Sequence, residues 1–158
     1  MKISGSYRFS NLSPTAVWPV LLDPSLLKEA LPHPVSEMHG LIYQRQGTFR
    51  FAAHVGPFAE HVFTLRLAFT DKTRPWHYTA QFEVVDENEQ STLRGESQWQ
   101  LTADEADTIA TYDLTPHATG EFDEVGALLV ETMLRSGVRQ TLAALEQWLH
   151  RQPVASNL

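Results

Sequence analysis

The sequence predicts an α+β fold in which a curved, seven-stranded antiparallel sheet is covered by one long C-terminal helix. Three observations lead to this prediction. Residues 2–10 alternate apolar and polar side chains, which is typical of a strand with one buried face. Further segments of alternating character follow between residues 35 and 115. Residues 121–151 instead repeat apolar side chains at helical spacing, so that one stripe can face the sheet.

The composition indicates one globular domain that does not bind nucleic acid. The chain has 158 residues, of which 42% are hydrophobic, and this is enough for a single core. We expect residues 1–151 to form the domain and residues 152–158 to be a flexible tail. The net charge of -7 argues against a partner that carries phosphates or anionic lipid.

The same composition bears on the compartment. The absence of cysteine excludes disulfides, thiolate zinc sites and cysteine nucleophiles, and it fits a reducing environment. Residues 1–10 lack the apolar run of a signal peptide, and no stretch reaches the roughly 18 apolar residues of a membrane span. We therefore expect a cytoplasmic protein with no integral membrane segment.

Two short helices are predicted directly after the first strand. Ser13 is a typical N-cap, and Pro14 suits the first helical position because its missing N–H leaves no hydrogen bond unmade. Pro24 ends this helix, since a proline ring clashes with the carbonyl four residues earlier. Residues 24–31 then predict a second helix, which Pro32 ends. The side chains expected to anchor the pair beneath the long C-terminal helix are Trp18, Leu22 and Leu26.

The middle of the chain predicts six further strands. Each has one apolar and one polar face, and the short links between them favour an antiparallel meander. Gly47 is interpreted as the break between the first two of these strands. The predicted strands are residues 41–46, 48–55, 58–70, 76–85, 92–102 and 108–116.

The only long helical pattern runs from Glu121 to Arg151, and about thirty residues at ~1.5 Å each give roughly 45 Å. Glu121, Asp123 and Glu124 are placed in its first turn, where the helix dipole favours negative charge. The predicted apolar stripe consists of Phe122, Val125, Leu129, Met133, Gly137 or Val138, Leu142, Leu145, Trp148 and Leu149.

This order of elements resembles the START-like, or SRPBCC, superfamily with its helix-grip fold. Within it the chain is most similar to the CoxG family of proteins associated with carbon monoxide dehydrogenase. The stretches that carry the resemblance are "KISGSYRF", "VWPVLLDPSLLKEALP", "VGPF" at 55–58, "TYDL" at 111–114 and "GEFDEVGALLV". The resemblance implies a cavity between the sheet and the long helix that takes apolar or lipid-like molecules.

Large aromatic residues at inward positions, with small residues between them, are consistent with such a cavity. The alternative is that the same side chains simply fill the core. We expect Gly137 to let the long helix approach the sheet. The candidate cavity residues are Phe49, Phe51, His61, Phe63, Leu65, Tyr78, Phe82, Ser97, Trp99, Tyr112, Leu129, Met133 and Gly137.

Three of these residues are the candidates for a hydrogen bond to a ligand. His61 is in phase with Phe63 and Leu65 and could donate a hydrogen bond to a carbonyl of a quinone-like or polyketide-like ligand. The hydroxyls of Tyr78 and Tyr112 could do the same. The seven histidines show no HxH or HExxH spacing, and no nucleophile elbow or phosphate loop is present. We therefore expect no catalytic residue, no metal site and no cofactor.

Three functional hypotheses follow. The favoured one is a non-catalytic protein that binds a hydrophobic small molecule, quinone-, lipid- or polyketide-like, or that assists a partner enzyme. The resemblance implies that this partner is a molybdenum hydroxylase-type enzyme, which the protein helps to mature or to recruit. The second hypothesis is an enzyme of the polyketide cyclase or aromatase kind. The third is a protein-interaction module with a filled core and an exposed apolar patch.

Overall fold

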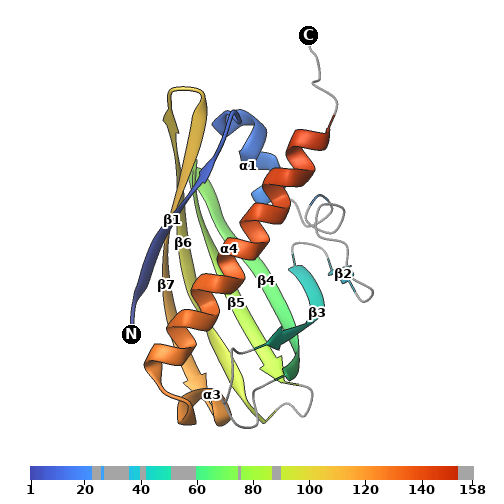
Figure 1. Cartoon of the computed structure of the whole chain (residues 1–158), viewed down its shortest axis with the longest axis vertical. Coiled ribbons are helices and arrows are strands. Elements are labelled where there is room, and N and C mark those ends of the chain that lie inside the picture. The colour runs from blue at the N-terminus through green and yellow to red at the C-terminus, as the bar shows by residue number, and fades with distance from the viewer. Residues whose placement is uncertain are drawn as a thin grey trace.

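The fold is an antiparallel sheet with a long helix across one face, as the computed structural model shows (Figure 1). The structure describes residues 1–22, 26, 36–39, 42–50, 60–74, 76–86 and 90–152. The elements are β1 (Ile3–Phe9), α1 (Pro14–Leu22), β2 (Ser36–His39), β3 (Ile42–Arg50), β4 (Glu60–Arg74), β5 (His77–Asp86), β6 (Thr92–Asp104), β7 (Asp107–Thr119), α3 (Glu121–Glu124) and α4 (Ala127–Arg151).

The strands follow the order β1-β7-β6-β5-β4-β3-β2, and every neighbouring pair is antiparallel. The predicted meander is therefore confirmed from β3 to β7, and β2 adds a further strand at its edge. The first strand closes the sheet on the other side, because β1 pairs along its whole length with β7. Sequence patterning carries no information on this long-range pairing.

The strand bounds differ from the prediction around Gly47. This glycine does not break the chain, since it pairs with Phe63 inside the continuous strand β3. A glycine keeps its backbone N–H and C=O, so it weakens a strand without interrupting the ladder. A strand that was not predicted, β2, precedes β3 and pairs with it from Ser36 to His39. Residues 51–55 of the predicted second strand lie outside the described part of the chain.

The alternating patterns of β1, β5, β6 and β7 are confirmed, because each strand buries one face. The helix α4 covers that face, as Figure 1 shows. Counted from Val130, its other buried side chains lie 3, 4, 12 and 15 residues further on, the spacing of a single helical stripe. The buried residues of α4 are Val130, Met133, Leu134, Leu142 and Leu145.

The prediction of one helix from Glu121 to Arg151 is wrong in its first turns. Gly126 has a φ of 92°, in the left-handed region, and it separates α3 from α4. The three acidic residues placed in the first turn of the long helix lie in α3, and α4 has no acidic residue in its own first turn. The 25 residues of α4 span about 38 Å rather than 45 Å.

The helix α1 begins and continues as predicted. Ser13 is the N-cap, because its Oγ accepts a hydrogen bond from the Ala16 N–H at 3.3 Å. Pro19 lies inside the helix without ending it. The predicted second helix, residues 24–31, lies outside the described residues except for Leu26. The predicted anchors are confirmed, since Trp18, Leu22 and Leu26 join one hydrophobic cluster with Leu142 and Leu145 of α4.

Candidate functional site

Three aromatic residues of the predicted cavity form a row across the inner face of the sheet. Tyr78 on β5 pairs with Trp99 on β6, and Trp99 pairs with Tyr112 on β7. The ring centroids of Tyr78 and Trp99 are 5.8 Å apart with an interplanar angle of 2°. Those of Trp99 and Tyr112 are 5.0 Å apart. The next position along the row is Gly5 on β1, which pairs with Tyr112 and has no side chain to continue the row.

Three further predicted cavity residues, Phe82, Ser97 and Met133, are buried in the core. Phe82 and Met133 belong to one hydrophobic cluster with Tyr112. The hydroxyl of Ser97 donates to the Ala80 carbonyl at 2.9 Å, so a backbone group already uses it. On α4, Leu129 and Gly137 are half-buried.

Five predicted cavity residues have no described side chain. Four of them lie at described strand positions, and Phe49 pairs in register with His61 between β3 and β4. Phe63 and Leu65 follow on β4, and Leu65 pairs with Val84 of β5. Phe51 lies outside the described residues. The hydrogen-bonding role of His61 therefore stays a prediction.

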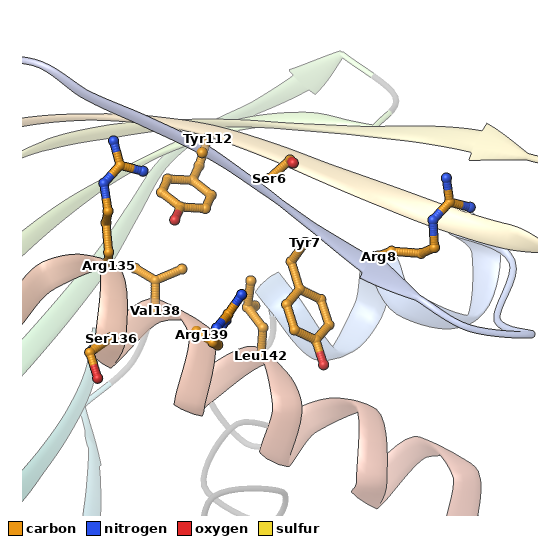
Figure 2. Close-up of a pocket in the computed structure, with 10 residues that line it drawn as sticks. Ser6, Tyr7, Arg8, Tyr112, Arg135, Ser136, Val138, Arg139 and Leu142 are labelled. Atoms are coloured by element: carbon orange, nitrogen blue, oxygen red, sulfur yellow. The ribbon is translucent and has the colours of Figure 1, made fainter. Parts of the chain in front are cut away.

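A pocket opens between the edge strand β1 and the helix α4, beside the end of the aromatic row (Figure 2). Its volume is about 620 Å³. Among the predicted cavity residues with described side chains, Tyr112 is the one that lines it. We call it the β1–α4 pocket, and its lining residues are Gly5, Ser6, Tyr7, Arg8, Tyr112, Arg135, Ser136, Val138, Arg139 and Leu142.

Tyr7 joins the two walls of this pocket. Its hydroxyl donates to Glu146 Oε1 on α4 at 2.8 Å, and the Ser10 N–H donates to Glu146 Oε2 at 2.7 Å. Burial, followed by the hydrogen bond to Glu146 and the charge of that carboxylate, raises the pKa of Tyr7 to about 12. The positive charge of Arg139 acts in the opposite direction. Tyr7 is therefore a neutral hydrogen-bond donor at ordinary pH and cannot serve as a base.

Two of the three arginines that line the pocket are neutralised by carboxylates. Arg8 donates to Asp104 at 2.8 Å and to Asp107 at 2.9 Å. Arg135 donates to Glu131 at 2.9 Å and reaches across to the Ser4 carbonyl at 2.7 Å. The second of these bonds ties α4 to β1 at one end of the pocket.

Arg139 differs from both. It lines the pocket between Val138 and Leu142, and no carboxylate in the described part of the chain pairs with it. The pocket thus carries one uncompensated positive charge in a chain whose net charge is -7.

The arginines were not predicted, because the candidate residues were those expected to face the space between the sheet and the apolar stripe of the long helix, and no arginine belongs to that stripe. A signal for them was present, since Arg135, Ser136 and Arg139 are spaced to share one side of a helix. What the sequence does not contain is the pairing of β1 with β7, which brings this side of α4 opposite Gly5 and Tyr7.

Among the residues that the structure describes, no group of three histidines or acidic side chains could hold a metal ion. Over the same residues, every helix is too short or too polar to cross a bilayer.

No protein-family model and no curated protein matches the chain. Solved structures do match it. A conserved protein from Geobacillus kaustophilus is 16% identical, covers 96% of each chain and superposes with a TM-score of 0.75. Protein MLL2253 from Mesorhizobium loti is 15% identical, with 98% of this chain and all of that one covered and a TM-score of 0.62.

Ara h 8.0201 is 13% identical, with 96% of this chain and 99% of that one covered and a TM-score of 0.60. Likenesses at this level of identity show the fold alone. They support the helix-grip arrangement, an antiparallel sheet closed by a long C-terminal helix.

Proposed function

We propose that the protein binds a small molecule with an apolar body, which enters through the β1–α4 pocket. The observation that carries this proposal is the row of rings from Tyr78 through Trp99 to Tyr112, which ends at this pocket. The pocket adds polar groups from Arg and Ser residues, and the rings of Tyr7 and Tyr112 with Val138 and Leu142 offer apolar contacts to such a molecule. The resemblance to the START-like superfamily implies the same kind of ligand.

Native mass spectrometry of the protein purified from its own host tests the proposal. We expect a co-purifying apolar molecule, binding of an added quinone that quenches tryptophan fluorescence, or a mass shift on addition of a fatty acid. Ser136→Trp, which puts bulk at the pocket wall, should abolish binding. Gln147→Trp, an exposed position of α4 outside the pocket, is the matched control and should bind normally. A bare protein mass together with no response to added ligands would contradict the proposal.

We further propose that binding serves a carrier or accessory role rather than a reaction. The similarity to the CoxG family supports this role and points to a molybdenum hydroxylase-type partner. Deleting the gene should lower the activity of such an enzyme in the host while its catalytic polypeptides are still made. Restoring the wild-type gene should recover that activity, and the Ser136→Trp gene should not. Full activity without the gene would contradict the accessory role.

Two alternatives make different predictions for the same protein. A cyclase needs a cavity base, and burial raises the pKa of Tyr78 well above its ordinary value, so this hydroxyl stays protonated. An interaction module with a filled core needs no ligand at all. Co-purification of a ligand would exclude the interaction module with a filled core. Turnover of that ligand would favour the cyclase.

A further inference from the structure

We propose that the β1–α4 pocket binds the carboxylate of an organic acid, with the guanidinium of Arg139 and the hydroxyl of Tyr112 as its two ligands. The inference rests on the proposed function, because it names the chemical class of the bound molecule. Arg139 and Tyr112 would bind the polar end of that molecule, whereas the aromatic row would contact its apolar end.

The first argument for a bound carboxylate is the charge balance of the pocket. Arg8 and Arg135 are each held by carboxylates of the protein. Arg139 lines the same pocket and has no such partner within the described residues. A guanidinium presents parallel N–H donors that match the two oxygens of a carboxylate. One uncompensated positive charge matches a singly charged acid.

The second argument is the buried hydroxyl of Tyr112. The residue is 7% exposed, and no group in the described part of the chain makes a hydrogen bond with its oxygen. Figure 2 shows this hydroxyl pointing from the sheet toward α4, into the space that Arg139 also lines. A buried hydroxyl without a partner costs free energy, which an acceptor oxygen of a ligand recovers. The ligand is therefore expected to bring an acceptor to this point.

The apolar side chains beside Arg139 would contact the body of an organic acid, which a wholly polar anion lacks. Val138 and Leu142 flank Arg139 on α4, and the ring of Tyr112 lies opposite them (Figure 2). The hydroxyl of Tyr7 is already used by Glu146, so Tyr7 offers mainly its ring. Apolar surface on both sides of one cation favours an acid with an apolar body over inorganic phosphate or a sugar phosphate.

Calorimetric titration with decanoate and with decanol tests the inference, since the two probes share a chain and differ in charge. We expect wild type to bind decanoate about tenfold or more tightly than decanol, as for a charge-assisted hydrogen bond. Arg139→Gln should lose this preference and leave decanol binding unchanged. Tyr112→Phe should weaken decanoate binding severalfold and keep the ring.

Arg151→Gln is the matched control, because Arg151 is an exposed arginine of α4 outside the pocket. It should bind both probes as wild type does. Equal wild-type affinities for decanoate and decanol, or an unchanged preference in Arg139→Gln, would overturn the carboxylate proposal and leave ligand binding intact. Binding of neither probe would overturn the carboxylate proposal, whereas the mass spectrometry described above decides ligand binding itself. Since Arg139 is exposed and unpaired in the described part of the chain, Arg139→Gln should keep the wild-type melting temperature.

Discussion

The hydroxyl end of Tyr112 lies directly over Gly5, its partner across the ladder between β1 and β7. A Cβ atom placed on Gly5 would lie 2.5 Å from Cζ of Tyr112, closer than real Cβ contacts allow. The missing side chain of Gly5 therefore makes room for the tyrosine ring. This close approach places the end of the aromatic row at the β1–α4 pocket.

Gly5→Ala should destabilise the protein by about 1–3 kcal/mol, the usual cost of overpacking. The ring of Tyr112 cannot move aside freely, because it is buried and packs against Trp99. Urea denaturation measures the free energy of unfolding, and the titrations described above would show weaker ligand binding.

The control for this prediction is the same substitution in a Tyr112→Leu background. Without the ring, Gly5→Ala should cost little. An equal cost in both backgrounds would show that Tyr112 is not the residue that requires glycine at position 5.

The two pocket tyrosines should respond differently to loss of the hydroxyl. Tyr7→Phe removes the hydrogen bond to Glu146, so we expect the free energy of unfolding to fall by about 1 kcal/mol or more. Tyr112→Phe removes a buried hydroxyl with no partner among the described residues, so stability should be unchanged or slightly higher. Thermal unfolding of the two variants without ligand checks this, and a larger loss for Tyr112→Phe would contradict it.

The raised pKa of Tyr7 predicts a loss of stability at alkaline pH. The folded protein holds this pKa at about 12, above the ordinary value of 10.0. The unfolded chain therefore releases the proton first, and the stabilisation is fully present below the ordinary value and lost as the pH rises toward the folded one. The free energy of unfolding, measured in urea across this window, should fall more steeply for wild type than for Tyr7→Phe.

Burial also raises the pKa of Tyr78, but Tyr78 is present in both of these proteins. The difference between the two curves therefore reports Tyr7. Parallel curves would mean that Glu146 does not hold the hydroxyl proton of Tyr7 in solution.

Gly95→Ala should be more damaging than Gly5→Ala. A Cβ atom on Gly95 would lie 2.9 Å from the carbonyl carbon of Thr115 and 3.1 Å from Cζ of Phe82. The first neighbour is backbone of the adjacent strand and cannot rotate away, so we expect a loss of about 3 kcal/mol. Gln100→Ala, an exposed position of the same strand, should stay within about 0.5 kcal/mol of wild type in the same urea experiment.

Besides the missed strand β2, two errors in the predicted elements concern glycine. Gly47 was interpreted as a break and lies inside β3, whereas Gly126 was placed inside a helix and, with a φ of 92°, separates α3 from α4. A glycine permits both a left-handed turn and a regular strand. Which of them forms depends on whether neighbouring elements supply hydrogen-bond partners, and the local sequence does not contain that information.

The sequence by itself determined the inner faces of β1, β5, β6 and β7, the capped start of α1 at Ser13 and the long C-terminal helix, because each depends on a local period or cap. Only the tertiary structure decided where the pocket lies. The pairing of Gly5 with Tyr112, 107 positions apart in the numbering, sets β1 beside β7. That pairing also brings Arg139 of α4 opposite Gly5 and Tyr112. Packing across the sheet selects which distant side chains meet, and the sequence near these residues does not contain that information.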